Sequence, residues 1–199
     1  MSRDSNTVWL DQNETDPARR YKMIITKQRR DGKNGVDMFL LYSADGIHWG
    51  TPLAELWFYG DRSTMFFNPC RNRWVYSLRI DRPKIERSRM YVECTDLLDG
   101  MTRADQLGRF WTCADRLDPR NPNPGLKDVP PQLYNLDAVA YESLMLGLFS
   151  IWEGQPQKTE KRNELLLGYS RDGCHWHRPD RRPFVGVNET DGAWNWGNI

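Results

Sequence analysis

Apolar residues recur along the chain in short runs that are typical of β-strands. Three of these runs open with a large side chain after basic or polar residues. A spacing of 21 to 25 residues separates each opening from the end of a later strand: Tyr21 from Ser43, Trp74 from Thr95, and Met145 from Ser170. Helical periodicity is nearly absent, so the pattern predicts three repeats of an all-β unit.

The end of the first repeat is copied almost unchanged at the end of the third. Residues 43–49 are Ser-Ala-Asp-Gly-Ile-His-Trp, and residues 170–176 are Ser-Arg-Asp-Gly-Cys-His-Trp. Each Asp-Gly pair predicts a tight turn between two antiparallel strands, because Gly tolerates positive φ. We expect the Ser hydroxyl to bond the Asp carboxylate or nearby backbone amides, and the Trp to fold back under the turn. Thr95-Asp96-Leu97 is interpreted as the degenerate middle copy.

An acidic residue precedes another apolar run in each repeat. The three pairs are Asp4 before residues 8–10, Asp61 before residues 65–67, and Asp137 before Val139 and Tyr141. Together the segments describe a four-stranded antiparallel blade, and blades set radially form a β-propeller. The predicted blades span residues 4–50, 61–112 and 135–178, and residues 179–199 enter a further one. Since about four blades are needed to close a ring, residues 1–199 are interpreted as a partial propeller domain, a fragment of a longer protein.

Composition narrows the classes of partner. The net charge of +1 provides no field to gather nucleic acid or anionic lipid, so neither partner is expected. The longest apolar run, residues 144–152, is too short to cross a bilayer, and no signal peptide opens this chain. We therefore expect a soluble chain, cytoplasmic as it stands. The four cysteines are expected to be reduced thiols, and no cofactor is predicted.

Two polar clusters are interpreted as structural. Cys174, His175 and His177 are residue types that bind metals, but His48 repeats His175 in the first turn without a neighbouring Cys or second His. No metal site is therefore predicted. The charged segment Glu153–Arg162 is interpreted as a long solvated hairpin loop whose basic residues need no ligand.

With these segments in place, the chain resembles the five-bladed β-propeller glycoside hydrolases of the clan that contains invertase-like family 32 and arabinanase-like family 43. It is most similar to bacterial relatives of family 32. The segments that carry the resemblance are Asp16–Met23, Gly60–Thr64, Asn68–Pro69 with Trp74–Ser77, Leu133–Val139, and both Ser-x-Asp-Gly-x-His-Trp turns. The resemblance implies an incomplete five-bladed ring that hydrolyses a glycosidic bond in an oligo- or polysaccharide.

In that clan three carboxylates from successive blades meet at the mouth of the central channel, as an Asp nucleophile or base, an orienting Asp and a Glu acid. The resemblance implies that Asp4, Asp61 and Asp137 are the catalytic carboxylates here. In one register Asp4 orients and Asp61 takes the place of the acid; in the other Asp4 is the nucleophile and Asp61 orients. The clan's Glu-Cys-Pro motif is absent, and Glu93 and Glu142 are the two candidates for its Glu.

The substrate-binding candidates are Arg62 and Glu142 for polar contacts and the rings of Trp9 and Tyr134 for stacking on a sugar. Each candidate Asp, taken singly, also fits a cap that accepts backbone N–H bonds. Two alternatives therefore stay open. One is a carbohydrate-binding propeller without catalysis, and the other is a sialidase-like propeller, whose Asp-box turn has a residue between Asp and Gly that these turns lack.

Overall fold

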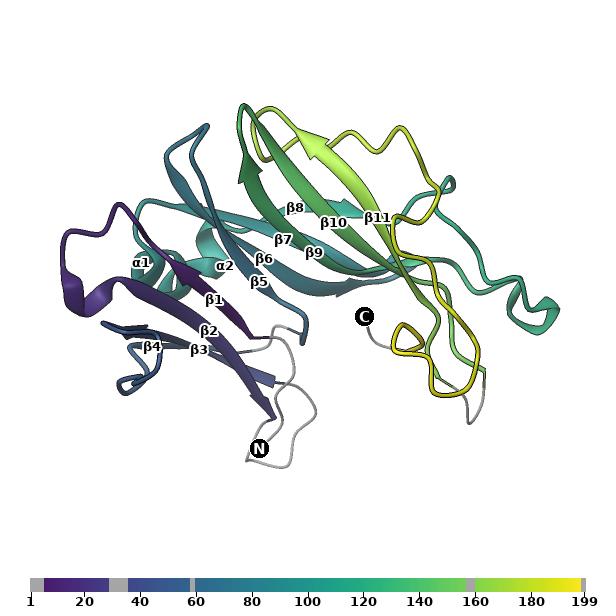
Figure 1. Cartoon of the computed structure of the whole chain (residues 1–199), viewed down its shortest axis with the longest axis horizontal. Coiled ribbons are helices and arrows are strands. Elements are labelled where there is room, and N and C mark those ends of the chain that lie inside the picture. Colours follow the sequence, from purple (N-terminus) through teal and green to yellow (C-terminus); the bar gives the residue numbers. More distant parts are fainter. Residues whose placement is uncertain (1–5, 29–35, 58–59, 157–159, 198–199) are drawn as a thin grey trace. The chain divides into compact units, whose positions relative to one another are not determined.

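The computed structural model describes residues 6–28, 36–57, 60–156 and 160–197. In these residues the chain forms three antiparallel sheets of three or four strands (Figure 1), which confirms the all-β class. It divides into two compact units, residues 1–79 with 90–110 (unit 1) and residues 80–89 with 111–199 (unit 2). None of the helices in the described part of the chain is long and apolar enough to cross a membrane. All four cysteines are free thiols, as expected.

Unit 1 holds the first sheet and most of the second. The strand order of the first sheet is β1 (Thr7–Leu10), β2 (Tyr21–Gln28), β3 (Val36–Ser43) and β4 (Ala54–Leu56), with the 3-10 turn η1 (Pro17–Arg19) between β1 and β2. The second sheet is β5 (Thr64–Asn68), β6 (Arg73–Arg82), β7 (Glu86–Cys94) and β8 (Arg109–Cys113). Strand β2 begins at Tyr21, as the apolar pattern predicted, and β6 begins at Arg73, one residue before the predicted opening at Trp74.

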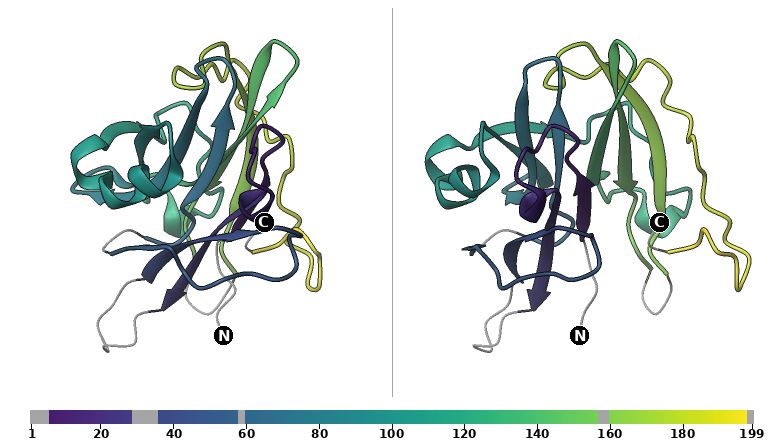
Figure 2. Two further views of the ribbon diagram at one scale, coloured as in Figure 1. Left: turned by 90° about the vertical axis from the view of Figure 1, so that its left-hand side faces the viewer. Right: turned by 60° about the vertical axis from the view of Figure 1, so that its left-hand side comes forward.

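The core of unit 1 lies between these two sheets and two short helices, α1 (Leu97–Thr102) and α2 (Ala104–Leu107), which lie in teal beside the second sheet (Figure 2). Ile24 and Leu40 of the first sheet, Tyr76 of the second and Met101 of α1 are all almost fully buried there. Burying such side chains contributes about 1.5–3 kcal/mol each. The two sheets are therefore packed by one shared apolar layer.

Unit 2 is built on the third sheet, whose strand order is β9 (Gln132–Tyr141), β10 (Leu144–Trp152) and β11 (Asn163–Ser170), preceded by the 3-10 turn η2 (Pro124–Leu126). Leu136, Phe149 and Leu166 form the buried face of this sheet. The ring of Trp176 packs edge-on against Phe149, with centroids 5.6 Å apart. The Trp of the second turn thus folds back onto the sheet as predicted.

The two Ser-x-Asp-Gly turns share the hydrogen bonds between the Ser hydroxyl, the Asp carboxylate and the turn amides, and in the first turn Ser43 Oγ also donates to the carbonyl of His48 (2.7 Å). In the second, the Oγ atom of Ser170 donates to Asp172 Oδ1 (3.0 Å) and accepts the N–H of Gly173 (2.8 Å). Asp172 Oδ1 accepts the amides of Cys174 and His175, and Oδ2 lies 2.7 Å from the His175 ring. These bonds hold the pKa of Asp172 well below its usual range, against the effect of its partial burial. The hydrogen bonds predicted for the turn are confirmed. In the described residues, the chain after the second turn pairs with β11 through two isolated antiparallel bridges, Tyr169 with His177 and Leu165 with Val185, and not as a second strand.

The turn glycines have the positive φ that the Asp-Gly pairs predicted, +74° at Gly46 and +72° at Gly173. Because L-residues resist this conformation, Gly173→Ala is expected to lower the free energy of unfolding by about 1 kcal/mol. Gly173→Asn is expected to lower it less. Urea unfolding measures the change. Gly186→Ala is the control, since Gly186 has ordinary φ and its new Cβ would meet only Pro183, at 3.7 Å. An equal loss in both Ala variants would contradict the prediction.

The middle copy of the turn is not a hairpin, which corrects the sequence prediction. Asp96 is the N-cap of α1, and its Oδ1 accepts the amides of Leu98 and Asp99, the same pattern that Asp172 shows. Leu97 stands where the other copies have Gly. A Leu does not readily adopt positive φ, so the chain continues as a right-handed helix.

Candidate functional site

The predicted catalytic residues lie in different surroundings. Asp4 falls outside the described residues. Asp61 lies in a turn ahead of β5 that is bonded to β6: the amide of Gly60 donates to the carbonyl of Arg79 (3.3 Å), and Ser63 Oγ accepts the Arg79 amide (3.0 Å). The carboxylate of Asp61 forms an ion pair with the Arg79 guanidinium in the same unit. Arg62 follows with a left-handed φ of 59°.

Asp137 does not precede a strand as the pattern predicted; it lies within β9, on the exposed side, with Asn135 Nδ2 donating to it at 2.6 Å. The sequence prediction was wrong here because the strand begins earlier, at Gln132. The pairing of β9 with β10 shifts by one residue at Tyr134, and that bulge hides the alternation. Glu142 is exposed at the β9–β10 turn with a φ of 51°. Asp61 belongs to unit 1, and Asp137 and Glu142 belong to unit 2.

The two rings predicted to stack on a sugar are already packed within the protein. Trp9 contacts Trp74 edge-on, with centroids 5.9 Å apart, and packs against the core of unit 1. Tyr134 is 1% exposed; the guanidinium of Arg87 lies 4.6 Å from its ring, and Lys161 Nζ donates to its hydroxyl at 2.9 Å. Neither ring is an open platform in this conformation.

A different cluster of carboxyl groups forms where β10 and β11 are joined. The connection is a hairpin, as predicted, but its two ends are not solvated. The amide of Glu153 donates to the carbonyl of Arg162 (2.9 Å), and the amide of Arg162 donates to the carbonyl of Gly154 (3.1 Å). These two hydrogen bonds close the base of the hairpin, here called the hairpin neck. They place the side chain of Glu153 beside those of Arg162 and Glu164. The Glu153 side chain is fully buried and that of Glu164 is nearly so.

One guanidinium binds three carboxylates in this cluster. Arg162 donates from Nε to Glu153 (2.8 Å), from Nη2 to Glu164 (2.7 Å) and from Nη1 to Glu189 (2.5 Å). Such charge-assisted bonds are short and fix the geometry of both partners. With all three nitrogens of Arg162 engaged, two buried glutamates share one cation.

Glu153 is the group in this cluster that favours its neutral form. Burial, with the neighbouring Glu164 carboxyl, raises the pKa of Glu153 from 4.5 to about 7, and Arg162 only partly opposes the rise. The Oε1 atom of Glu153 is buried and accepts no hydrogen bond within the described residues. A proton held on this carboxyl at neutral pH is the condition for a general acid.

A second buried carboxylate in unit 2 shows what a purely structural arrangement looks like. Asp118 accepts bonds from Arg178 (2.6 Å), from Arg181 (2.7 Å) and from the amide of Asp115 (2.7 Å). Arg178 and Arg181 also pair with Asp115, which is partly exposed, so two cations and an amide serve a single buried carboxylate. Glu153 and Glu164, by contrast, share one cation, so the cluster at the hairpin neck has an excess of buried acid.

A cavity of about 330 Å³ adjoins the cluster. Its wall combines the charged groups Arg162, Glu189 and Glu160 with amides and one indole, and the remaining lining residues are Asn121, Pro122, Asn123, Pro156 and Trp196. The segment that carries Trp196 is tied down by Asn163 Nδ2, which donates to the carbonyl of Gly197 (2.9 Å). An aromatic face with convergent amide and carboxylate groups can stack on a sugar ring and bond its hydroxyls.

Sequence reasoning missed this site because it interpreted residues 153–162 as solvated. The available signal was the pairing itself. Glu153 directly follows the apolar run 144–152, and Arg162 lies three residues before the apolar run 165–167, so a hairpin between those runs brings the two residues close together. Comparisons with protein-family models, curated proteins and solved structures find no match for this chain.

Proposed function

We propose that the chain is part of a five-bladed β-propeller of the glycoside hydrolase type and that it hydrolyses a glycosidic bond in an oligo- or polysaccharide. Three consecutive antiparallel sheets, with one turn sequence closing the first and the third, support the propeller. The shared core of β1–β4 and β5–β8 is what adjacent blades require.

The hydrolytic function is carried by one observation, the pairing of a buried and an exposed carboxyl group on one guanidinium at a polar cavity. The bonds from Arg162 to Glu153 and Glu189 keep these two carboxyl groups within about 8 Å of each other, and paired carboxyls in glycosidases are about 5–9.5 Å apart. Glycoside hydrolysis needs one protonated and one ionised carboxyl. Glu153 fits the first role, and Glu189, half-exposed in the cavity wall, fits the second.

In the proposed reaction the proton on Glu153, which is buried behind the cavity wall, passes through a water molecule to the glycosidic oxygen as the bond to the sugar carbon breaks. Glu189 stabilises the positive charge that develops on the ring. A water molecule then adds to the sugar carbon as the new hydroxyl, and the proton that it loses returns to Glu153. Trp196 stacks on the sugar, while Asn121 and Asn123 bond its hydroxyls. Hydrolysis yields two sugars, each ending in a hydroxyl.

The aspartates implied by the resemblance remain candidates for an ionised role. Asp61 has the strongest case, because an ion pair with Arg79 is what a nucleophilic or orienting carboxylate requires. Arg62 next to it remains the candidate for a polar substrate contact.

The proposal is tested by assaying the protein against a panel of aryl glycosides and oligosaccharides and by measuring glycan binding calorimetrically. Hydrolysis of at least one substrate is expected. Trp196→Ala is expected to weaken binding of that glycan about 3- to 10-fold, because a stacked ring contributes about 0.5–1.5 kcal/mol. Trp194→Ala is the matched control, since Trp194 is 80% exposed and does not line the cavity. Equal binding by the two variants would remove the cavity from the proposal.

A carbohydrate-binding propeller without catalysis is the second candidate. The complete burial of Glu153 favours this function, because a buried carboxyl does not reach a bound sugar directly to donate its proton. Binding without turnover of any panel member, with Trp196→Ala still weakened, would select this function over hydrolysis.

A further inference from the structure

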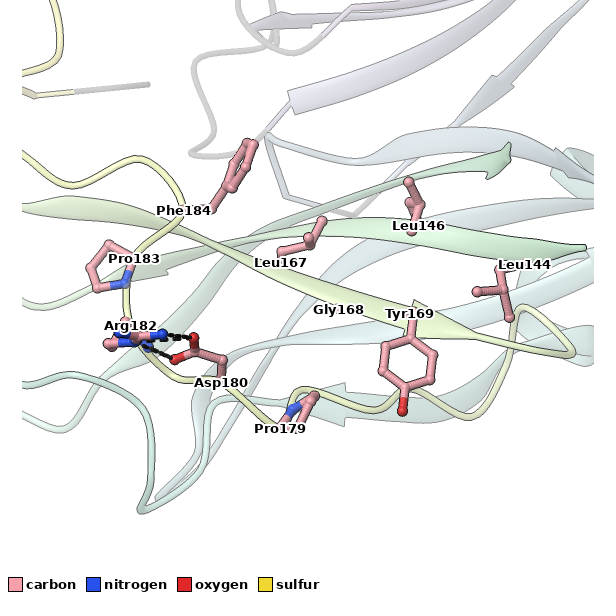
Figure 3. Close-up of a pocket in the computed structure, with 10 residues that line it drawn as sticks. All are labelled: Leu144, Leu146, Leu167, Gly168, Tyr169, Pro179, Asp180, Arg182, Pro183 and Phe184. Carbon is pink, nitrogen blue, oxygen red and sulfur yellow. Dashed lines mark hydrogen bonds and ion pairs between the residues drawn. The ribbon is translucent and has the colours of Figure 1, made fainter. Parts of the chain in front are cut away.

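Two hollows of unit 2 differ in the charge that each presents to a ligand. The larger, of about 580 Å³, is a groove over the outer face of the third sheet (Figure 3). Leu146 and Leu167 form its apolar floor, and Asp180 and Arg182 on its rim bond each other at 2.7 Å, so this pair has no net charge. In the proposed propeller the next blade packs on that face. The cavity of about 330 Å³ at the hairpin neck is the one whose charges are unbalanced.

Acids outnumber bases around the cavity at the hairpin neck. Among the described residues that line it, Glu160 and Glu189 are the acids and Arg162 is the base. Arg162 also bonds Glu153 and Glu164, so one positive charge is shared among several carboxyl groups. Even with Glu153 protonated, the surplus is negative. A ligand of positive charge is therefore favoured over a neutral or negative one.

The two basic side chains that are adjacent in sequence here, Lys161 and Arg162, are already occupied. The Nε, Nη1 and Nη2 atoms of Arg162 each donate to a carboxylate. Lys161 does not line the cavity, and its Nζ donates to the hydroxyl of Tyr134 at 2.9 Å. A sugar that carries carboxylate or sulfate groups would thus meet like charge at this cavity.

Glu160 is the carboxylate that a ligand can reach. It is exposed, and within the part of the chain that the structure describes it forms no ion pair. Its side chain lies against Gly197, the residue after Trp196: a Cβ atom built on Gly197 would come within 3.3 Å of Glu160 Oε2. The carboxylate and the indole of Trp196 therefore flank the same part of the cavity. A carboxylate beside an aromatic face is an arrangement that binds an organic ammonium group.

We propose that the glycan bound at this cavity carries protonated amino groups, as a chain of 2-amino-2-deoxyhexose residues does. One ammonium group pairs with Glu160 at the edge of the Trp196 ring, while Asn121 and Asn123 bond hydroxyls. Glu160 is then the residue that determines specificity. The inference rests on the proposed function, because it requires that the cavity binds a sugar.

Calorimetric titration with three trisaccharides tests the inference at about pH 6 and low ionic strength, where the sugar amines are protonated. The three are a glucosamine trisaccharide, its fully N-acetylated form and the corresponding glucose trisaccharide. The amine form is expected to bind about 3- to 30-fold more tightly than either neutral form, as an ion pair with an added cation–π contact would give. The difference is expected to shrink in about 0.5 M NaCl, because salt screens exposed charges.

Two charge-removing variants assign the preference. Glu160→Gln is expected to abolish it and to leave the affinity for the neutral trisaccharides within about twofold of the wild type. Glu55→Gln is the matched control, since it removes the same charge from an exposed position on β4 of unit 1. It is expected to keep the full preference. Circular dichroism shows that both variants are folded.

The outcomes separate this inference from the proposed function. Neutral trisaccharides that bind as tightly as the amine form overturn the inference alone, and so does a preference that Glu160→Gln keeps or that Glu55→Gln also loses. A glucosamine trisaccharide that does not bind, while another glycan of the panel does, has the same meaning. Failure of every glycan in the panel to bind overturns the proposed function, and this inference with it.

Discussion

Replacing Glu153 by Gln lowers kcat for oligosaccharide hydrolysis by about 10²- to 10⁴-fold, the contribution of a positioned general acid. The amide cannot donate a proton to the leaving oxygen, although it keeps the volume of the side chain. Aryl glycosides with acidic leaving groups need little protonation, so their kcat falls much less. Steady-state kinetics on both substrate classes measures the contrast.

The pH dependence of the wild type gives a second readout of the same group. Since the pKa of Glu153 is raised to about 7, kcat is expected to fall as the pH rises through 7. The folded protein also binds more protons than the unfolded chain between pH 4.5 and 7. The stabilisation from protonated Glu153 is therefore full below 4.5 and is lost as the pH rises through 7. Relative to Glu153→Gln, the wild type loses up to about 3 kcal/mol between pH 4.5 and 8.

Two further variants assign the effect to Glu153. Glu93→Gln is the control, because Glu93 pairs with Arg71 near the surface of unit 1 and is one of the two glutamates that the sequence offered for the acid. Glu93→Gln is expected to keep the activity of the wild type, and its kcat is expected to fall as the pH rises through 7, as in the wild type. Asp61→Asn is expected to lower kcat equally on both substrate classes, as loss of an ionised carboxylate would. Full activity in Glu153→Gln would refute the donor role, and full activity in Asp61→Asn would remove Asp61 from the mechanism.

The local features of the fold could be predicted because they depend on residues close together in the chain. The apolar run that opens at Tyr21 begins a strand at that position, and the run predicted to open at Met145 begins a strand one residue earlier, at Leu144. The Asp-Gly turns form because Gly46 and Gly173 adopt positive φ within a single hydrogen-bonded loop. The middle copy differs at one position, Leu97, and that single difference converts a turn into a helix. Propensity and capping act over a few residues, so these outcomes can be inferred from the sequence.

The candidate site could not be predicted in the same way, because burial is decided by distant segments. Asp137 looked like the start of a strand, but a bulge at Tyr134, set by pairing with β10, extends the strand upstream. The sequence of the charged run between β10 and β11 does not reveal whether the residues at the hairpin neck are buried or exposed. Residues near 121 and 196 line the cavity at that neck, and nothing local in the run specifies their approach. Periodicity finds strands, but it does not find the polar groups that tertiary packing encloses.

Removing the shared cation is expected to have the largest effect on stability. Arg162→Met leaves Glu153 and Glu164 buried without a positive partner, and breaking a buried pair in this way costs about 3–5 kcal/mol. The loss depends on pH with a definite sign. At pH 8 the unfolded chain ionises Glu153 freely, whereas the folded variant must keep this carboxyl neutral or bury its charge, so destabilisation is greatest there. Near pH 4.5 Glu153 is protonated at little cost, and much of the stability returns.

Urea unfolding of Arg162→Met at pH 4.5 and pH 8 measures this difference, with Arg103→Met as the control. Arg103 pairs with Asp99 on an exposed helical turn, and both side chains are about half exposed. Such a pair contributes about 0.3–0.5 kcal/mol at either pH. A loss in Arg162→Met that is the same at both pH values would show that the guanidinium acts through packing alone. In that case Glu153 would not be the protonated carboxyl on which the proposed chemistry depends.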